Sequence, residues 1–224
     1  MKGTLYVVAL PIGNTLDISY HAVDILGKVS IIACEDTRKF SMLKKRIGFE
    51  TKAVLMAYHS YNEMHSSEGL IKKLMEGNDI ALVTDAGTPR ISDPGYHIVR
   101  KSHEQGVSVK AIPGASGLSA AMSIAPIPLD PLLYLGFISP KAGRRDKTLN
   151  LYQDFSGTIC LYESVHRIIK LLEAIKNLWG NLEVFIVREL TKQHEDIFWG
   201  EIEKAIPWVG NNKRGEFIVF IYKK

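Results

Sequence analysis

Short apolar, β-branched runs alternate with helical patterns through the first half of the chain. The predicted strands are Thr4–Leu10, Val29–Ala33, Ala53–Ala57, Ile80–Thr84 and Val107–Ile112. The predicted helices between them are Ile18–Leu26, Thr37–Ile47, Asn62–Met75 and Tyr96–Gln105. We expect Asp17 to cap the first helix and Gly27 to close it. Strand, helix, strand in this order predicts a mostly parallel sheet with helices on both faces.

The second half is set apart by prolines. Pro113-Gly114 and then the proline-rich segment Ala125–Pro131 interrupt the middle of the chain. We predict an N-terminal parallel α/β domain over 1–113 and a C-terminal mixed α/β domain over 114–224. The predicted strands of the second domain are Leu132–Ile138, Thr158–Tyr162, Val184–Val187 and Phe217–Tyr222. Its predicted helices are Asp146–Phe155 and Val165–Leu178.

Composition excludes several protein classes. The longest apolar runs fall short of the roughly 18 residues that span a bilayer, and the N-terminus lacks a signal-peptide pattern. Cys34 and Cys160 lie far apart, which argues against a disulfide framework or a metal cluster. We therefore expect a cytoplasmic protein without a membrane partner or metal site. The net charge of +4 is compatible with a polyanionic partner and equally with an ordinary solvated surface.

Three turn-rich segments follow predicted strands of the first domain. These are Pro11–Asn14, Asp85–Gly95 and Ile112–Gly117. Ligands of parallel sheets bind beyond the carboxyl ends of the strands, so the three segments predict a ligand site. In the middle segment Gly87 permits close backbone approach. The alternative is that these are plain strand-to-helix turns, with Asp93 and Ser116 as helix caps.

Familiar catalytic motifs are absent from the sequence. It contains no G-x-G-x-x-G, no P-loop, no G-x-S-x-G elbow and neither CxxC nor HExxH. Charged residues follow two strands of the second half, in 162–167 and 188–195. Such charges either brace each other, as Glu163 with Arg167 and Arg188 with Glu189, or face a cleft. We expect bracing for the two arginines and cleft exposure for Glu163 and Lys192.

Taken together, the motifs resemble one family. They are LYVVALPIGN (5–14), ACEDTR (33–38), YHSYNE (58–63), DAGTPRISDPGY (85–96), IPGAS (112–116), YESVHR (162–167) and RELTKQHE (188–195). In this order they resemble the branch of the tetrapyrrole methylase superfamily that methylates cytidine 2′-O in small-subunit ribosomal RNA. The resemblance implies two α/β domains, S-adenosylmethionine in the cleft between them, and a homodimer.

The resemblance also implies site residues. Cofactor contacts would fall on Leu10, Pro11, Asp85, Thr88, Ser116, Gly117, Tyr162 and Leu190. A ribose hydroxyl is a poor nucleophile, so a general base is expected, and its candidates are Glu35, Asp36 and Glu163. Candidates for binding ribosomal RNA or the small ribosomal subunit are Arg38, Asn62, Lys192, Arg144 and Arg145.

The chain departs from the family pattern in several places. Leu10 stands for a common threonine, Ala115 for a usual proline, and Arg90 for an uncharged residue, while Ala125–Pro131 differs from S-G-L-P. Many members also continue with a helical extension beyond the position of Lys224. Two alternatives stay open: methylation of a tetrapyrrole or corrinoid precursor, and a non-catalytic nucleotide-binding or ribosome-associated module.

Overall fold

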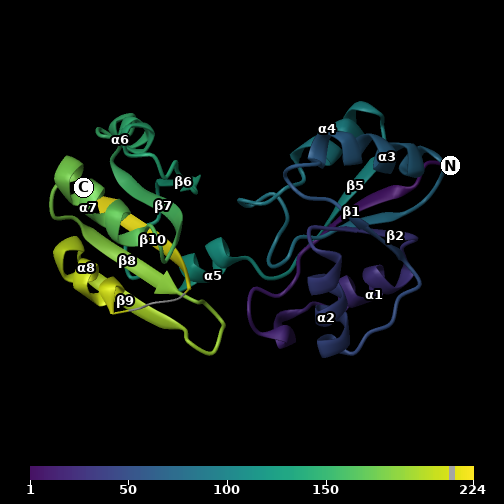
Figure 1. Ribbon diagram of the computed structural model, residues 1–224, viewed down its shortest axis with the longest axis horizontal. Helices are drawn as coiled ribbons and strands as arrows, with labels where there is room; N and C mark the ends of the chain where they lie inside the picture. Colours follow the sequence, from purple (N-terminus) through teal and green to yellow (C-terminus); the bar gives the residue numbers. More distant parts are fainter. Residues whose placement is uncertain (212–214) are drawn as a thin grey trace. The chain divides into compact units, whose positions relative to one another are not determined.

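The computed structural model describes residues 1–211 and 215–224 (Figure 1). The chain divides into two units, Met1–Ser116 and Gly117–Lys224, close to the predicted boundary after residue 113. Each unit contains one five-stranded sheet. Of the described residues, no helix is both long and apolar enough to cross a membrane.

The sheet of the first unit is entirely parallel. Its strands are β1 (Thr4–Val8), β2 (Ile31–Cys34), β3 (Val54–Ala57), β4 (Ile80–Leu82) and β5 (Ser108–Ile112). They are ordered β3-β2-β4-β1-β5. The α/β class and the parallel sheet predicted from the alternating pattern are therefore confirmed.

Helices cover both faces of this sheet, because successive strand residues point to opposite sides. The helices are α1 (Tyr20–Lys28), α2 (Thr37–Ile47), α3 (Glu63–Met75) and α4 (Tyr96–Glu104). Ile32 packs with Leu26 and Phe40 of α1 and α2. Its neighbour Ile31 packs with Leu70 and Ile98 of α3 and α4. Figure 1 shows the two helix pairs on opposite faces.

The predicted start of the first helix is wrong. Asn14 accepts the N–H of Leu16 and begins a short 3-10 helix, η1 (Thr15–Asp17), so Asp17 cannot cap α1. Ser19 caps α1 instead, through the N–H of Ala22, and α1 runs past Gly27 to Lys28. Helix α4 begins at Tyr96, as predicted, and its N-cap is Gly95 rather than Asp93, the cap of the alternative interpretation.

The sheet of the second unit is mixed, as predicted. Its strands are β6 (Leu132–Gly136), β7 (Gly157–Ser164), β8 (Glu183–Arg188), β9 (Asp196–Glu201) and β10 (Glu216–Lys223), ordered β6-β7-β10-β8-β9. Among the described strands of this second sheet, β6 and β7 pair in parallel and the other neighbours pair antiparallel. Its helices are α5 (Gly117–Ser123), α6 (Ala142–Asn150), α7 (Ile168–Trp179) and α8 (Ile202–Gly210).

Several boundaries in this unit correct the prediction. Helix α6 begins four residues before Asp146 and ends at Asn150 rather than Phe155. Beyond it, the buried ammonium of Lys223 binds the carbonyls of Tyr152 (2.9 Å) and Gln153 (2.5 Å), which fixes that turn outside the helix. Helix α7 starts at Ile168 rather than Val165. Strand β9 and helix α8 were not predicted.

Candidate active site

Two strand-end loops of the first unit are joined by backbone hydrogen bonds. The N–H of Leu10 donates to the carbonyl of Gly87 (2.9 Å), and the N–H of Gly87 donates back to Leu10 (3.0 Å). Gly87 has φ +73°, and a Cβ there would lie 3.2 Å from Ile12 Cγ2. A side chain at this position would be both strained and crowded. Glycine is therefore required where the two loops meet.

The third loop joins the same place. Thr88 Oγ1 donates to the carbonyl of Ala115 at 3.0 Å. The expected convergence of three loops is therefore present, although Ala115 stands where the family has proline. Beside it, the hydroxyl of Ser116 is buried and has no hydrogen-bond partner among the described residues. Buried polar groups are nearly always satisfied, so an unsatisfied hydroxyl at this point needs a reason.

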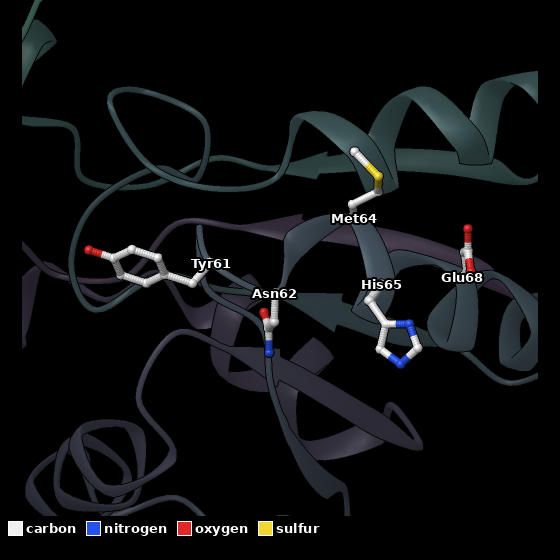
Figure 2. Close-up of a pocket in the computed structure, with 5 residues that line it drawn as sticks. All are labelled: Tyr61, Asn62, Met64, His65 and Glu68. Carbon is white, nitrogen blue, oxygen red and sulfur yellow. The ribbon is translucent and has the colours of Figure 1, made fainter.

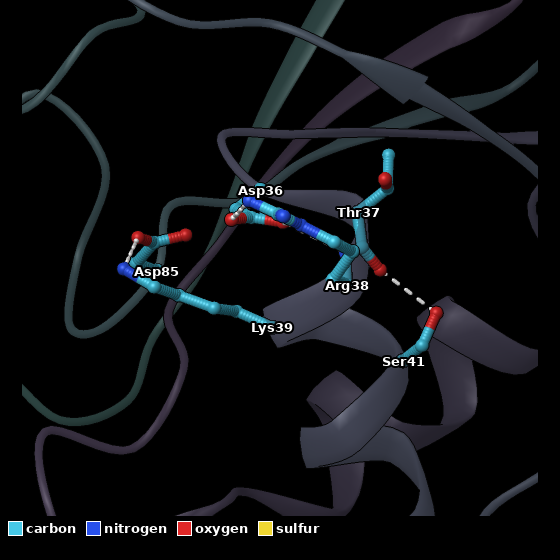
Figure 3. Close-up of polar contacts among 6 residues, drawn as sticks. All are labelled: Asp36, Thr37, Arg38, Lys39, Ser41 and Asp85. Atoms are coloured by element: carbon cyan, nitrogen blue, oxygen red, sulfur yellow. Dashed lines mark hydrogen bonds and ion pairs between the residues drawn. The ribbon is translucent and has the colours of Figure 1, made fainter.

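An acidic corner follows β2 and β4, which are adjacent in the sheet. Glu35 comes after β2 and Asp85 after β4, and Lys39 on α2 pairs with Asp85 at 2.5 Å (Figure 3). Burial, and then the charge of Asp85, raise the pKa of Glu35, while Lys39 and His59 oppose the rise. Glu35 is thus a half-buried carboxyl poised to accept a proton.

Asp36 is occupied by its own helix. Its Oδ1 accepts the backbone N–H of Arg38 at 2.8 Å, which makes it the N-cap of α2. The Arg38 guanidinium bonds both carboxylate oxygens, at 3.1 and 2.8 Å (Figure 3). These bonds hold the pKa of Asp36 well below its usual range. With both oxygens engaged, Asp36 is a weaker proton acceptor than Glu35.

Asn62 lies in the loop between β3 and α3. Its side chain accepts the N–H of His59 (2.8 Å) and donates to Ala57 (3.3 Å), so it closes the loop locally. It also lines a shallow hollow of about 260 Å³ with exposed Tyr61 and Met64 (Figure 2). His65 and Glu68 complete the lining in the same view.

Glu63 was missed by the sequence reasoning. Its Oε1 accepts the Tyr58 hydroxyl (3.1 Å) and the N–H groups of Gly95 (3.0 Å) and His97 (2.9 Å). Burial disfavours its ionisation, but these donors outweigh burial and lower its pKa. The carboxylate therefore caps α4 from α3 and fixes the end of the 85–95 loop. The one sequence signal is that Gly95 offers α4 no capping side chain of its own.

In the second unit, Gly117 and Tyr162 meet at the start of α5. A Cβ on Gly117 would lie 3.3 Å from Tyr162 Oη. Burial raises the pKa of Tyr162 above its usual range. Leu190 packs in the same apolar cluster as Tyr162. Three residues that the family resemblance assigns to the cofactor thus share one region of this unit.

Glu163 and Lys192 both have partners. Glu163 is 3% exposed, pairs with Arg167 at 2.7 Å and accepts the N–H of Ser164 at 2.8 Å. The expectation that Glu163 faces a cleft is therefore wrong, because its buried carboxylate braces Arg167 instead. Lys192 lies 3.0 Å from Glu189 and 3.2 Å from Glu216. Burial lowers the pKa of Lys192, but the two carboxylates outweigh burial and raise it overall.

Of the remaining predicted substrate residues, Arg38 and Arg144 are exposed, whereas the Arg145 side chain is only 15% exposed. The Arg38 side chain is 87% exposed. Arg144 and Arg145 are on the first turns of α6, where Arg144 is exposed and Arg145 bonds Asp146 at 2.9 Å. Among the described residues, no group of histidine, cysteine and acidic side chains could hold a metal ion.

Comparisons with known proteins agree on one group. Residues 4–206 match the family described as Tetrapyrrole (Corrin/Porphyrin) Methylases. The chain is 40% identical to "Ribosomal RNA small subunit methyltransferase I" of Escherichia coli O157:H7, over 98% of this chain and 78% of that protein. It is 36% identical to the protein of the same name from Mycoplasmopsis pulmonis, over 98% of both chains. A crystal structure of diphthine synthase has the same fold, with a TM-score of 0.76 at 13% identity over 99% of this chain and 90% of that one.

Proposed function

This chain belongs to the tetrapyrrole (corrin/porphyrin) methylase family and is a methyltransferase, and we propose that it methylates a cytidine 2′-hydroxyl of small-subunit (16S) ribosomal RNA. The methyl donor of the proposal is S-adenosylmethionine. We further propose that the enzyme acts in the cytoplasm as a homodimer, on ribosomal RNA or on the small ribosomal subunit.

One observation carries the cofactor assignment. The three joined loops present an unpartnered buried hydroxyl, Ser116 Oγ, beside a backbone that only Gly87 permits. A polar ligand with donor and acceptor groups fits such a place, because it would satisfy the hydroxyl that the protein leaves unpaired. We assign cofactor contacts to residues of both units. They are Leu10, Pro11, Asp85, Thr88, Ser116, Gly117, Tyr162 and Leu190.

The chemistry asks for alignment and for one proton acceptor. S-adenosylmethionine supplies an already activated methyl group, so the protein must hold the ribose hydroxyl in line with it. Glu35 is our first choice for accepting the hydroxyl proton, since its carboxyl is half-buried with a raised pKa. Asp36 is bound up with Arg38 and Glu163 with Arg167, so we rank both behind Glu35.

We assign RNA contacts to cationic and polar side chains. Arg38 and Arg144 are exposed and suit phosphates, and the Arg38 guanidinium is oriented by Asp36. Arg145, Asn62 and Lys192 also bond to neighbours within the protein, and in our proposal they order the surface that RNA meets.

The alternatives rest on weaker support. Tetrapyrrole enzymes such as the uroporphyrin-III-C-methyltransferase of Thermus thermophilus share 15% identity with this chain, which speaks for the fold alone. The relatives at 36–40% identity bear the ribosomal RNA name. A non-catalytic module would give no reason for the raised pKa of Glu35 or for the buried, unpartnered hydroxyl of Ser116.

The test is methyl transfer by the purified protein. We expect labelled S-adenosylmethionine to methylate small-subunit RNA or the assembled subunit at one cytidine 2′-oxygen, located by mass spectrometry. Transfer to a tetrapyrrole but not to RNA would favour the second enzyme class. Cofactor binding without transfer to any of these substrates would favour the non-catalytic module.

A further inference from the structure

Phe137 is an aromatic side chain placed in the open directly after β6. It is 47% exposed and belongs to none of the apolar clusters formed by the described residues. Its ring meets Tyr162 edge-on, with centroids 5.7 Å apart and planes at 82°. Tyr162 is in turn edge-on to Tyr134 at 5.4 Å. The ring is thus supported from one side by aromatic packing, while part of its surface faces solvent.

A planar cation is held against the same ring. The Arg167 guanidinium lies 5.9 Å from the Phe137 centroid, within the range of cation–π attraction. Glu163 fixes the guanidinium at 2.7 Å and Ser164 Oγ at 3.2 Å. The Glu163 side chain is only 4% exposed, and a carboxylate is kept in such a place only when it is paired. Glu163 therefore acts through Arg167.

We propose that Phe137 and Arg167 form a stacking subsite for the unpaired base of the acceptor nucleotide. This inference rests on the proposed function and adds the group that recognises the RNA. Single-stranded bases stack on exposed aromatic rings and on guanidinium planes. Phe137 offers the ring and Arg167 the guanidinium plane. The Phe137 ring contacts Tyr162, which we assign to the cofactor. A base stacked here would bring its own ribose toward the methyl donor.

The assignment changes the role of Glu163. It becomes a positioning residue that orients Arg167, rather than a general base. The loop after Phe137 leads through Lys141 to α6, where Arg144 is exposed. These cations suit the phosphates next to a stacked nucleotide.

The first test is a substitution series at Phe137 with small-subunit RNA, or the assembled subunit if naked RNA is not methylated. We expect Phe137→Ala to raise KM for RNA by about 5- to 150-fold, the loss that removal of one stacked base brings. Phe137→Trp should restore KM, whereas Phe137→Leu should not, because leucine lacks a π face. The affinity for S-adenosylmethionine should stay near the wild-type value, and the melting temperature should fall only slightly, because the ring is 47% exposed and loses one edge-on contact. Tyr20→Ala, at a 97% exposed ring on α1, is the matched control and should leave KM unchanged.

Arg167 and Glu163 provide a second series. Arg167→Lys keeps the positive charge but removes the planar guanidinium, so it should raise KM for RNA. Because the charge is kept, the salt dependence of binding should change little. Glu163→Gln should raise KM moderately and leave the pH profile of kcat unmoved, which a general base would shift.

The outcomes separate the two proposals. If wild type methylates no RNA, the proposed function and this subsite both fall. If wild type is active but Phe137→Ala keeps its KM, or Phe137→Leu equals wild type, only the stacking subsite is overturned. A kcat profile that Glu163→Gln displaces would return Glu163 to the list of proton acceptors.

Discussion

Glu35 owes its chemistry to burial and to the charges beside it. Burial and Asp85 raise its pKa, while Lys39 lowers it. A base acts only when ionised, so methyl transfer should fall as the pH drops through this raised pKa. Lys39 therefore controls where the acid limb of the pH profile lies.

Replacing Lys39 tests this arrangement. We expect Lys39→Ala to move the acid limb of kcat to higher pH, because the Glu35 carboxylate loses a favourable charge. Lys45→Ala removes the same charge from an exposed position on the same helix and should leave the limb in place. Glu35→Gln should abolish the limb along with most activity. If Lys39→Ala and Lys45→Ala shift the acid limb equally, Glu35 is not the proton acceptor whose pKa sets that limb.

Ser116 and Ser102 form a natural pair for testing the cofactor site. Both hydroxyls are buried without a partner among the described residues. We expect Ser116→Ala to weaken S-adenosylmethionine binding by about 2- to 12-fold, the value of one hydrogen bond, with no loss of stability. Ser102→Ala, inside α4, should leave the affinity unchanged. Calorimetric titration of both variants measures the difference, and equal affinities in the two would contradict the role of Ser116.

Helices α3 and α4 are tied together by one carboxylate. Glu63 takes a hydroxyl and two N–H donors, and its pKa is lowered. A carboxyl group with a depressed folded-state pKa stabilises the fold above its unfolded pKa, and that contribution disappears as the pH falls through the folded value. The Glu63 carboxylate therefore stabilises the fold at neutral pH, and this contribution is lost in acid.

Urea unfolding of a Glu63 variant measures the cap. We expect Glu63→Gln to cost about 1–3 kcal/mol at pH 7, and the cost should shrink in acid as the wild-type carboxylate takes up its proton. Glu68→Gln on the same helix breaks only the ion pair between Lys101 and the Glu68 carboxylate, whose side chain is 66% exposed. This substitution should cost about 0.5 kcal/mol or less. A cost for Glu63→Gln that is independent of pH would mean that its charge does not matter.

The central strands β2 and β4 of the first unit could be predicted because buried parallel strands are continuous apolar runs. Strand β9 and helix α8 could not. Ile197 and Trp199 of β9 are exposed, and Pro207 lies inside α8, where proline argues against a helix. The meeting of the Leu10, Gly87 and Ala115 loops followed from strand order. The bonds of Lys39 and Glu63 did not, because they depend on where each helix settles over the sheet edge.

Taken as a chain of two units, the protein should be stabilised by its cofactor. A ligand at 100 times its Kd adds about 2.7 kcal/mol to the free energy of unfolding, which corresponds to a rise in Tm of about 5–10 °C at this size. We expect this rise with S-adenosylmethionine and a much smaller one in Asp85→Ala. Asp24→Ala, which removes an exposed carboxylate of α1, should respond as wild type. An Asp85→Ala variant with the full rise would place the cofactor elsewhere.

The two cysteines are distributed one to each unit, and both are free and buried. Burial, and then the nearby acidic groups, raise the pKa of Cys34 to about 12, and burial raises that of Cys160 as well. A thiol reagent can therefore reach each sulfur only when its own sheet opens. The labelling rate of Cys34 therefore measures how often the first unit opens, and the labelling rate of Cys160 measures how often the second unit opens. No introduced probe is needed. A methyl donor that binds residues of both units should lower the labelling rates of both cysteines. A donor that binds one unit would lower the rate of the cysteine in that unit and leave the other rate unchanged.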